Sequence, residues 1–418
     1  MATAAFHTPI HPLAEAAVAA SRVVSLASTA QRNDCLNAFA NIITKRCELL
    51  VNANQKDLAN ADKLSAALRE RLELDEKRIR AMAGGVFAIA AQSDPIGRIS
   101  NLSPMPSGIQ VGKMRVPLGV ILAIYESRPN VTADIAALAV KSGNAVILRG
   151  GGEAQHSSNA IGECMTAALA AVGLPTTTAQ VISGRDIVGE LLCSSGIDLV
   201  IPRGGRGLIE RVISEAKMPV LKHLDGNCHL YIDAAADLEM AVKLTNNAKT
   251  RRLGVCNALE CLLTHEAVAA KVLPSVADVL SAAKVELRGC VQTQKILGRR
   301  SIPVKDDEWQ TEYLAPILRI KVVASADDAI AHINTFGSGH TDAIVSKDAA
   351  IQWRFLREVD SSSVIVNAST AFADGGEYGL GAEVGISTDK LHARGPVGAE
   401  GLTTQKFIVL GEGQTRDN

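Results

Sequence analysis

The sequence predicts an α/β protein built on parallel, doubly wound sheets, and three observations lead to this prediction. Apolar runs alternate with helical periods, as in residues 116–172, which read strand, helix, strand and helix; such repeats imply a parallel sheet covered on both faces. The 418 residues exceed one ordinary core, so we expect two or three domains. Hydrophobic residues make up 47% and aromatic residues only 3% of the chain, which suits aliphatic helices on buried strands.

The first pattern covers the N-terminal half. Residues 12–92 have apolar residues at i, i+3 and i+4 and predict helices almost throughout. Residues 93–116 are rich in Pro, Gly and Ser and predict loops with short strands. Four strands with helices between them are then predicted, at 116–125, 144–149, 179–183 and 198–202. Sheets of this kind bind ligands beyond the carboxyl ends of their strands.

A second α/β pattern begins near residue 237. It predicts helices and strands in alternation, the helices at 237–249 and 265–283 and the strands at 259–264, 316–323, 342–346 and 362–367. The long polar stretch 361–396 predicts a substrate loop. The segment 406–413 is strand-like without a local partner, which predicts pairing with another subunit.

Charge and composition favour small-molecule chemistry. The formal net charge is −1, so no long-range field favours nucleic acid or an anionic membrane. No apolar run reaches the roughly 18 residues of a membrane span, and the start lacks the pattern of a secretory or transit peptide. Eight scattered cysteines form neither a disulfide framework nor a zinc motif. We therefore expect a cytoplasmic protein with reduced thiols, no metal, and no nucleic-acid or membrane partner.

Two glycine-rich turns follow strands of the first pattern. Gly150 begins a triplet between a strand and a helix, and Gly204 and Gly205 lie in IPRGGRG after the strand 198–202. Each turn can be a tight connection or a close approach of the backbone to a nucleotide, and two such turns from one sheet favour the nucleotide. Arg149 can pair with a phosphate on an adenine ribose, as NADP would need. Neither turn has the spacing G-x-G-x-x-G.

Cys256 is the candidate nucleophile. A free cysteine is usually a small buried hydrophobe, but its neighbours Gly254 and Asn257 are not core residues, and the basic segment 249–252 precedes it. The residues after Cys256 predict a helix turn, whose N–H groups would favour a thiolate. Cys261 lies inside an apolar run, and we keep the core interpretation for it.

Three further features have a structural and a functional interpretation. Asn130 precedes a predicted helix, where it can cap the helix or donate to a developing oxyanion. Arg394 lies in the long polar stretch and can bind a carboxylate or a phosphate. Cys228 adjoins His229, but neighbouring strand residues point to opposite faces, so we predict no Cys–His dyad.

Several long segments match a known family: YESRPNVT (125–132), GNAVILRGG (143–151), IPRGG (201–205), NAKTRRLGVCNALECLL (247–263), VNASTAFADGGEYGLGAEV (366–384) and LHARGP (391–396). Through them the chain resembles the aldehyde dehydrogenase superfamily from about residue 12 to its end. The resemblance implies an aldehyde dehydrogenase-like α/β fold of two doubly wound domains plus a β oligomerisation element, and hence a homo-oligomer. The implied parts are a cofactor-binding domain (1–97, 120–227 and 361–390), a catalytic domain (228–360) and the oligomerisation element (98–119 and 391–418).

The resemblance also implies roles for single residues. Cys256 takes the place of the nucleophile and Asn130 that of the oxyanion donor. The cofactor, NADPH or NADP, would be held by Arg149 and Gly150 near the adenine ribose, by Gly204 and Gly205 over the pyrophosphate and by Glu312 at the nicotinamide ribose. The substrate would contact Arg394 and Asn257.

One departure from the superfamily pattern bears on the reaction. Hydrolytic members carry a glutamate in an E-L-G-G motif that activates water, and here HLDGN (223–227) places His223 at that position; the role of Asp225 stays open. Phosphate would then release the acyl group. The implied activity is NADPH-dependent reduction of L-glutamyl 5-phosphate to L-glutamate 5-semialdehyde through a Cys256 thioester, the second step of proline biosynthesis from glutamate, with a glutamate 5-kinase as a possible partner. The alternatives are a hydrolytic NAD-dependent aldehyde dehydrogenase and a non-catalytic relative of the same fold.

Overall fold

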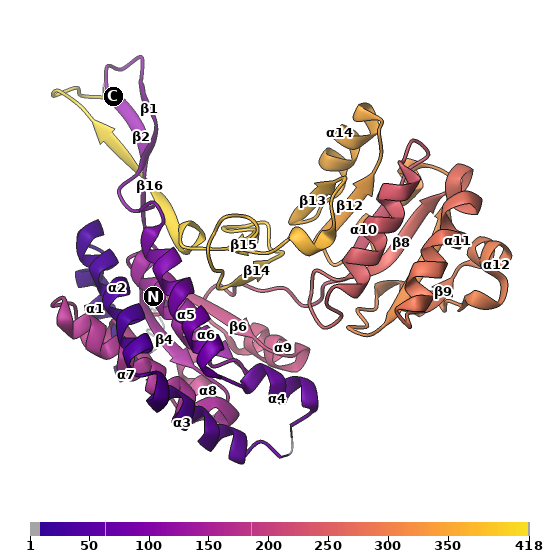
Figure 1. Cartoon of the computed structure of the whole chain (residues 1–418). Helices are drawn as coiled ribbons and strands as arrows, with labels where there is room; N and C mark the ends of the chain where they lie inside the picture. The colour runs from indigo at the N-terminus through magenta and orange to yellow at the C-terminus, as the bar shows by residue number, and fades with distance from the viewer. Residues whose placement is uncertain (1–8, 63, 185, 417–418) are drawn as a thin grey trace, which may run out of the picture. The chain divides into compact units, whose positions relative to one another are not determined.

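The computed structural model describes residues 9–62, 64–184 and 186–416 as two units, each with its own parallel sheet. The first unit comprises Met1–Lys222, Gly379–Gly385 and Val397–Asn418, and the second comprises His223–Tyr378 and Ile386–Pro396 (Figure 1). Together with a separate antiparallel sheet, these units confirm the predicted α/β fold class. No helix in the described ranges is long and apolar enough to cross a membrane.

Helices account for the N-terminal region, as predicted: α1 (Pro12–Val24), α2 (Thr29–Lys45), α3 (Cys47–Ala59), α4 (Ala66–Leu72) and α5 (Glu76–Ala91). Side chains that precede them accept bonds from unpaired N–H groups of the first turn, such as Ser28 from Gln31 and Asp75 from Arg78. Alanines of α1 pack on the sheet of this unit, and α2, α3 and α5 form an outer helical layer.

The first unit contains a four-stranded parallel sheet in the order β5-β4-β3-β6. Its strands are β3 (Val120–Tyr125), β4 (Ala145–Arg149), β5 (Ala179–Ile182) and β6 (Leu199–Arg203), and its helices are α6 (Asn130–Lys141), α7 (Gln155–Ala171), α8 (Asp186–Leu192) and α9 (Arg206–Glu215). Gly143, with φ at +71°, ends α6 as predicted. The order reverses between β3 and β6, and such a switch point opens a ligand crevice at the carboxyl ends of the strands.

The second unit contains a seven-stranded parallel sheet in the order β10-β9-β11-β8-β7-β12-β13. Its strands are β7 (Cys228–Ile232), β8 (Leu259–His265), β9 (Glu286–Gly289), β10 (Ile302–Pro303), β11 (Ile317–Val323), β12 (Thr341–Val345) and β13 (Ser363–Val366). Its helices are α10 (Leu238–Thr250), α11 (Glu266–Ala282), α12 (Val291–Leu297), α13 (Ala326–Phe336) and α14 (Ala349–Glu358). Central strands β7, β8 and β12 are buried on both faces, which explains their nearly continuous apolar runs.

A three-stranded antiparallel sheet joins β1 (Ile99–Pro104), β2 (Gln110–Pro117) and β16 (Thr403–Leu410). The sequence predicted no partner for the last strand within the chain, and this was wrong, because β16 pairs with β2 over its whole length. The partner lies almost 300 residues earlier, too far for local patterns to indicate it. Two short strands, β14 (Gly385–Ser387) and β15 (Gly395–Val397), pair with each other.

The unit boundaries differ from the predicted domains at residues 361–390. The prediction assigns this segment to the cofactor-binding domain, but residues 361–378 and 386–390 belong to the second unit. The physical reason is β13, which hydrogen-bonds to β12 in parallel and forms the edge of the seven-stranded sheet. The first unit ends its longest segment at Lys222, and the roles assigned to the predicted domains stay predictions.

Candidate active site

Cys256 lies in the turn between α10 and β8 of the second unit and is partly buried. The helix predicted after Cys256 is absent, since the chain turns and enters β8 at Leu259. The apolar residues that follow are extended because they pair with β7 and β11. The N–H groups of a helix that begins at Cys256 are therefore not available to favour a thiolate.

The loop before β7 packs directly on the backbone of Cys256. A Cβ added at Gly226 would lie 1.9 Å from the Cys256 carbonyl oxygen and 2.6 Å from its Cα, so only glycine fits there. The Cys228 thiol donates to the same carbonyl at 3.1 Å. The position of Cys256 is thus fixed by close contact with residues 226–228.

Glu312 is joined to the same loop. Its Oε1 accepts the N–H of Gly226 at 2.9 Å. Burial raises the pKa of Glu312 to about 7, and the negative charges of Asp225 and Glu260 act in the same direction. Glu312, the predicted cofactor carboxylate, and Cys256, the predicted nucleophile, therefore contact the same loop through Gly226. Asp225 of this loop lies close enough to raise the pKa of Glu312.

Two histidines stand beside Cys256. The rings of His223 and His340 meet edge to face with centroids 5.2 Å apart, and each ring offers a nitrogen in a group with Cys256 Sγ whose atoms lie within 4.8 Å of one another. His340 is fully buried, and burial together with His223 lowers its pKa to about 3. Sequence reasoning missed His340. A lone histidine after Gly337 and Gly339, directly before the apolar strand β12, was the available signal.

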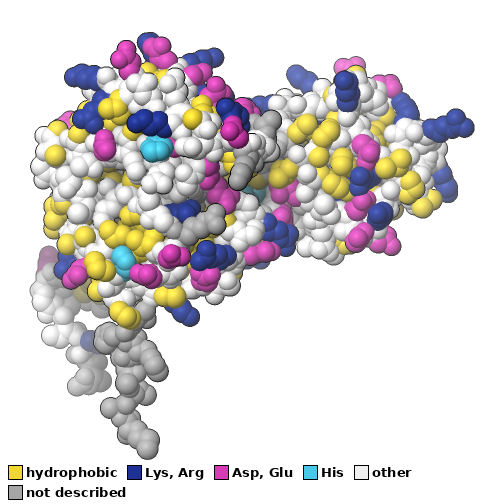
Figure 2. Space-filling model, turned by 90° about the horizontal axis from the view of Figure 1, so that it is seen from below, with side chains coloured by type: hydrophobic (Ala, Val, Ile, Leu, Met, Phe, Trp, Pro, Cys, Tyr) yellow, Lys and Arg dark blue, Asp and Glu magenta, His cyan; other side chains and the backbone are white. Residues whose placement is uncertain are grey.

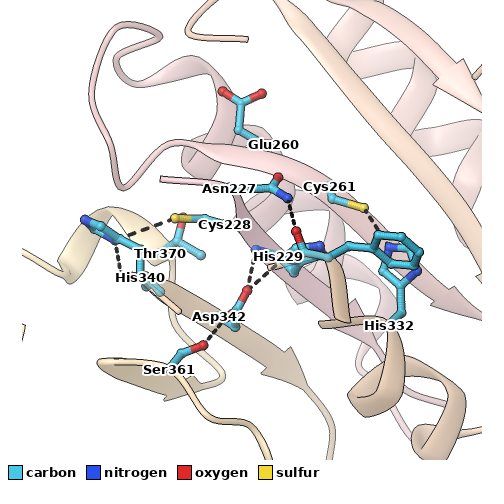
Figure 3. A network of polar contacts seen from close by, with 12 residues as sticks. Asn227, Cys228, His229, Glu260, Cys261, His332, His340, Asp342, Ser361 and Thr370 are labelled. Atoms are coloured by element: carbon cyan, nitrogen blue, oxygen red, sulfur yellow. Dashed lines mark hydrogen bonds and ion pairs between the residues drawn. The ribbon is translucent and has the colours of Figure 1, made fainter. Parts of the chain in front are cut away.

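Cys228 and His229 point to opposite faces of β7, so the prediction of no dyad is confirmed (Figure 3). Cys228 points toward Cys256 and His340, whereas His229 Nδ1 bonds Asp342 at 2.9 Å.

A second, buried group of cysteine and histidine lies on the face of β7 to which His229 points. It consists of His229, Cys261 and His332. Burial opposes ionisation of the Cys261 thiol, but the two histidines outweigh it and lower its pKa. Cys261 is buried as predicted, but in a polar cluster.

The predicted substrate residues are engaged within the second unit. Asn257 is buried, and its amide donates to the Ala373 carbonyl at 3.1 Å, which anchors the chain beyond β13 to the Cys256 turn. Arg394 donates to the carboxylate and the carbonyl of Asp360, at 2.9 and 3.0 Å. Their substrate contacts stay predictions.

The predicted cofactor residues of the first unit gather at the carboxyl ends of its strands. Arg149 ends β4, and its Nε donates to the Gly184 carbonyl at 3.3 Å. A pocket here is lined by Arg149, Gly150, Gly152, Gln155, Ser158, Asn159 and residues 181–184. A Cβ at Gly150 would lie 2.9 Å from Ser158 Oγ, so the glycine keeps this pocket open. Arg149 is a partly exposed cation at the edge of this pocket, and its contact with a phosphorylated ribose stays a prediction.

The second glycine turn already holds a carboxylate. The N–H of Gly205, which precedes α9, donates to Glu126 Oε2 at 2.9 Å, and a Cβ at Gly204 would lie 2.4 Å from the same oxygen. A carboxylate thus occupies the N-terminus of α9, and binding of a pyrophosphate at this turn stays a prediction. Asn130 begins α6, and its amide donates to Asp134 at 3.1 Å. Burial raises the pKa of Asp134 to about 6.

The two units present their candidate residues at opposite ends of their sheets. In the first unit, Glu126, Arg149 and Gly205 follow strands, as expected for a doubly wound sheet. In the second unit, Cys256 and His340 precede β8 and β12, at the amino edge of the sheet. The rule that ligands bind at the carboxyl ends of parallel strands therefore predicts the residues of the first unit and not Cys256 and His340.

This fold and a cysteine site of this kind define a class of oxidoreductases, and the chain belongs to the aldehyde dehydrogenase family: the family model matches residues 3–294 and 300–383. The resemblance stated from the sequence is thereby confirmed. Members of the family use nicotinamide cofactors.

Solved structures show which members of the family this chain is similar to. The chain is 41% identical to gamma-glutamyl phosphate reductase from Thermotoga maritima, with 97% of this chain and 99% of that chain covered and a TM-score of 0.94. It is 30% identical to gamma-glutamyl phosphate reductase from Saccharomyces cerevisiae, with 98% and 100% covered and a TM-score of 0.54. An engineered glycolyl-CoA reductase with bound NADP+ shares the fold at 17% identity, with 97% and 98% covered and a TM-score of 0.66.

Proposed function

We propose that this chain catalyses NADPH-dependent reduction of L-glutamyl 5-phosphate to L-glutamate 5-semialdehyde and phosphate, the second step of proline biosynthesis from glutamate. The observation that carries the proposal is the group formed by Cys256 and His223, in which an imidazole replaces the water-activating carboxylate of hydrolytic aldehyde dehydrogenases. The two relatives named gamma-glutamyl phosphate reductase, at 41% and 30% identity, support it.

Cys256 would act as the nucleophile. Its sulfur attacks the acyl carbon, and phosphate leaves with the electron pair of the broken bond, so that a thioester forms on the protein. NADPH, which Arg149, Gly150 and Glu312 would hold, would supply the hydride for the acyl carbon. Cys256 leaves as a thiolate when the aldehyde is released. The contact between Gly226 and the Cys256 backbone keeps the sulfur in one place during these steps.

Developing negative charge on the acyl oxygen needs donors. We assign the backbone N–H of Cys256 and the amide of Asn130 to this role, and one such donor contributes about 3–4 kcal/mol in a transition state. The bond from Asn130 to Asp134, one helical turn on, fixes the direction of the amide at the start of α6.

The cofactor assignment rests on separate residues of the two units. Arg149 and Gly150 would hold a 2′-phosphate and Glu312 the nicotinamide ribose. Arg149→Gln should therefore raise the KM for NADPH at least about tenfold and change the KM for NADH little, because loss of one charged contact costs roughly 1.5–3 kcal/mol. Initial-rate measurements with both cofactors test this, and equal losses would remove the assignment to Arg149.

The decisive experiment measures the reverse reaction with and without phosphate. Pyrroline-5-carboxylate, the cyclic form of the aldehyde, is mixed with NADP and enzyme, and NADPH is followed spectrophotometrically. We expect turnover only with phosphate, because the chain lacks, at position 223, the carboxylate that activates water in hydrolytic members of the family. Turnover of equal rate without phosphate would instead identify a hydrolytic aldehyde dehydrogenase.

A further inference from the structure

Cys256, His223 and His340 form a group whose composition is that of a metal site. One ligand atom from each lies within 4.8 Å of the other two. One thiolate and two imidazoles suit Zn²⁺, which in sites with three protein ligands keeps a fourth position for water or another small ligand. The cysteine and His223 are partly exposed, so an ion can reach them, while His340 is fully buried.

The hydrogen bonds of His340 leave its Nε2 as the nitrogen for a metal, and those of His223 indicate which of its nitrogens carries the proton. His223 Nδ1 lies 2.9 Å from the Ile386 carbonyl oxygen, which only accepts, so Nδ1 carries the proton and Nε2 a lone pair in the neutral ring. His340 Nδ1 bonds Thr341 Oγ1 at 2.8 Å, and its buried Nε2 has no hydrogen-bond partner among the described residues. Zinc-binding histidines are commonly oriented in this way, through a bond at the second nitrogen.

The second cysteine–histidine group of this unit lacks these properties. His229, Cys261 and His332 are fully buried or nearly so. The Nζ of Lys321 lies 3.0 Å from His332 Nδ1. A metal on His332 Nε2 would require a proton on Nδ1, which would then face an ammonium group. The group around Cys256 is therefore the one to which a metal is assigned.

We propose that Zn²⁺ binds Cys256, His223 and His340 and reversibly blocks the enzyme. Binding replaces the thiol proton, which goes to solvent, and no electron is transferred. The sulfur then bonds to the metal and is unavailable to an acyl group. The inhibition rests on the proposed function of Cys256, whereas the binding does not.

The test measures protection of Cys256 from alkylation. Protein is treated with iodoacetamide at rising ZnCl₂, and labelling of each cysteine peptide is quantified by mass spectrometry. We expect zinc to suppress labelling of Cys256 and EDTA to restore it. His340→Asn and His223→Asn should each raise the half-protecting zinc concentration more than about tenfold, the lower end of the effect of losing even an outer-shell partner. His265→Asn, the same change at the N-cap of α11 in the same unit, should leave it unchanged.

Several outcomes would overturn the proposal. Zinc could fail to protect Cys256 from alkylation, or it could protect Cys256 equally in wild type and in both histidine variants. It could also protect the exposed Cys193 equally, which would indicate unspecific binding to thiols. If circular dichroism shows that His340→Asn does not fold, zinc protection of Cys256 in the His223→Asn variant decides, because His223 is partly exposed. Alkylation needs no turnover, so zinc protection can succeed while the phosphate-dependent assay fails, and the reverse.

Discussion

Cys256 is distinguished from the other cysteines of the chain by what surrounds it. Cys256 is partly accessible, as are Cys47 and Cys290, but its backbone is held in close contact with Gly226. Cys256→Ala should abolish both reduction and phosphate-dependent oxidation, because no thioester can form. Cys193→Ala, at an exposed cysteine, should keep full activity. Steady-state rates of both variants test this, and turnover retained by Cys256→Ala would place the nucleophile elsewhere.

Glu312 gives the reaction a pH dependence. Its folded pKa of about 7 lies above the ordinary value of 4.5, because the carboxyl is largely shielded from water. The ionised carboxylate accepts ribose hydroxyls better than the protonated form, so the KM for cofactor should rise as pH falls through about 7. In Glu312→Gln the KM should be high and independent of pH between 6 and 8. A wild-type KM that is flat over this range would contradict the role of Glu312.

The raised pKa of Glu312 also affects stability, with a definite sign. A carboxyl whose folded pKa is raised stabilises the fold fully below pH 4.5, and this contribution is lost as pH rises through about 7. Glu312→Gln should therefore raise the Tm at pH 8 relative to wild type and leave it nearly unchanged at pH 5. The expected gain in unfolding free energy at pH 8 is on the order of 1 kcal/mol. Thermal unfolding at the two pH values measures it.

Among the elements, the loop before β7 and the turn before β8 act together. Gly226→Ala would force the Cys256 backbone away, since the new Cβ meets its carbonyl at 1.9 Å. We expect kcat to fall roughly 100-fold, the cost of misplacing a reacting group by about 1 Å. Gly84→Ala, inside α5 with no atom within 4 Å of the new Cβ, should leave kcat unchanged and raise the Tm slightly, because alanine favours a helix more than glycine does. Rates and Tm of both variants decide, and an active Gly226→Ala enzyme would show that the turn is not fixed by this contact.

The sequence predicted elements better than it predicted their assembly. Strands such as β4 and β6, and the helices of residues 12–92, follow from local periodicity, and their bounds agree to within a few residues. The helical turn predicted after Cys256 was wrong, because residues 256–258 form a tight turn that leads directly into β8, whereas the strand predicted at 259–264 is confirmed. His340 was missed because it joins Cys256 only through the sheet, 84 residues later in the chain. The partner of β16 depends on pairing at a still longer separation.

Across the whole molecule, charge gives little guidance to partners, because cations and anions are interspersed on the face shown in Figure 2. Exposed apolar side chains indicate more about possible partners. Phe407 and Val409 alternate along β16 and are 69% and 58% exposed, although they lie in a regular strand. An edge strand with such side chains favours association with another copy of the chain. This supports the homo-oligomer expected from the sequence.

Disruption of β16 should therefore change the mass of the assembly. Phe407→Glu combined with Val409→Glu places two charges on this strand and should shift the protein toward monomer in size-exclusion chromatography with light scattering. Leu26→Glu, at a side chain that is 87% exposed in the loop after α1, is the matched control and should keep the wild-type mass. Because β16 already pairs with β2 inside the chain, circular dichroism must show that the double variant is folded. A folded double variant with unchanged mass would mean that the β1-β2-β16 sheet is not the contact between subunits.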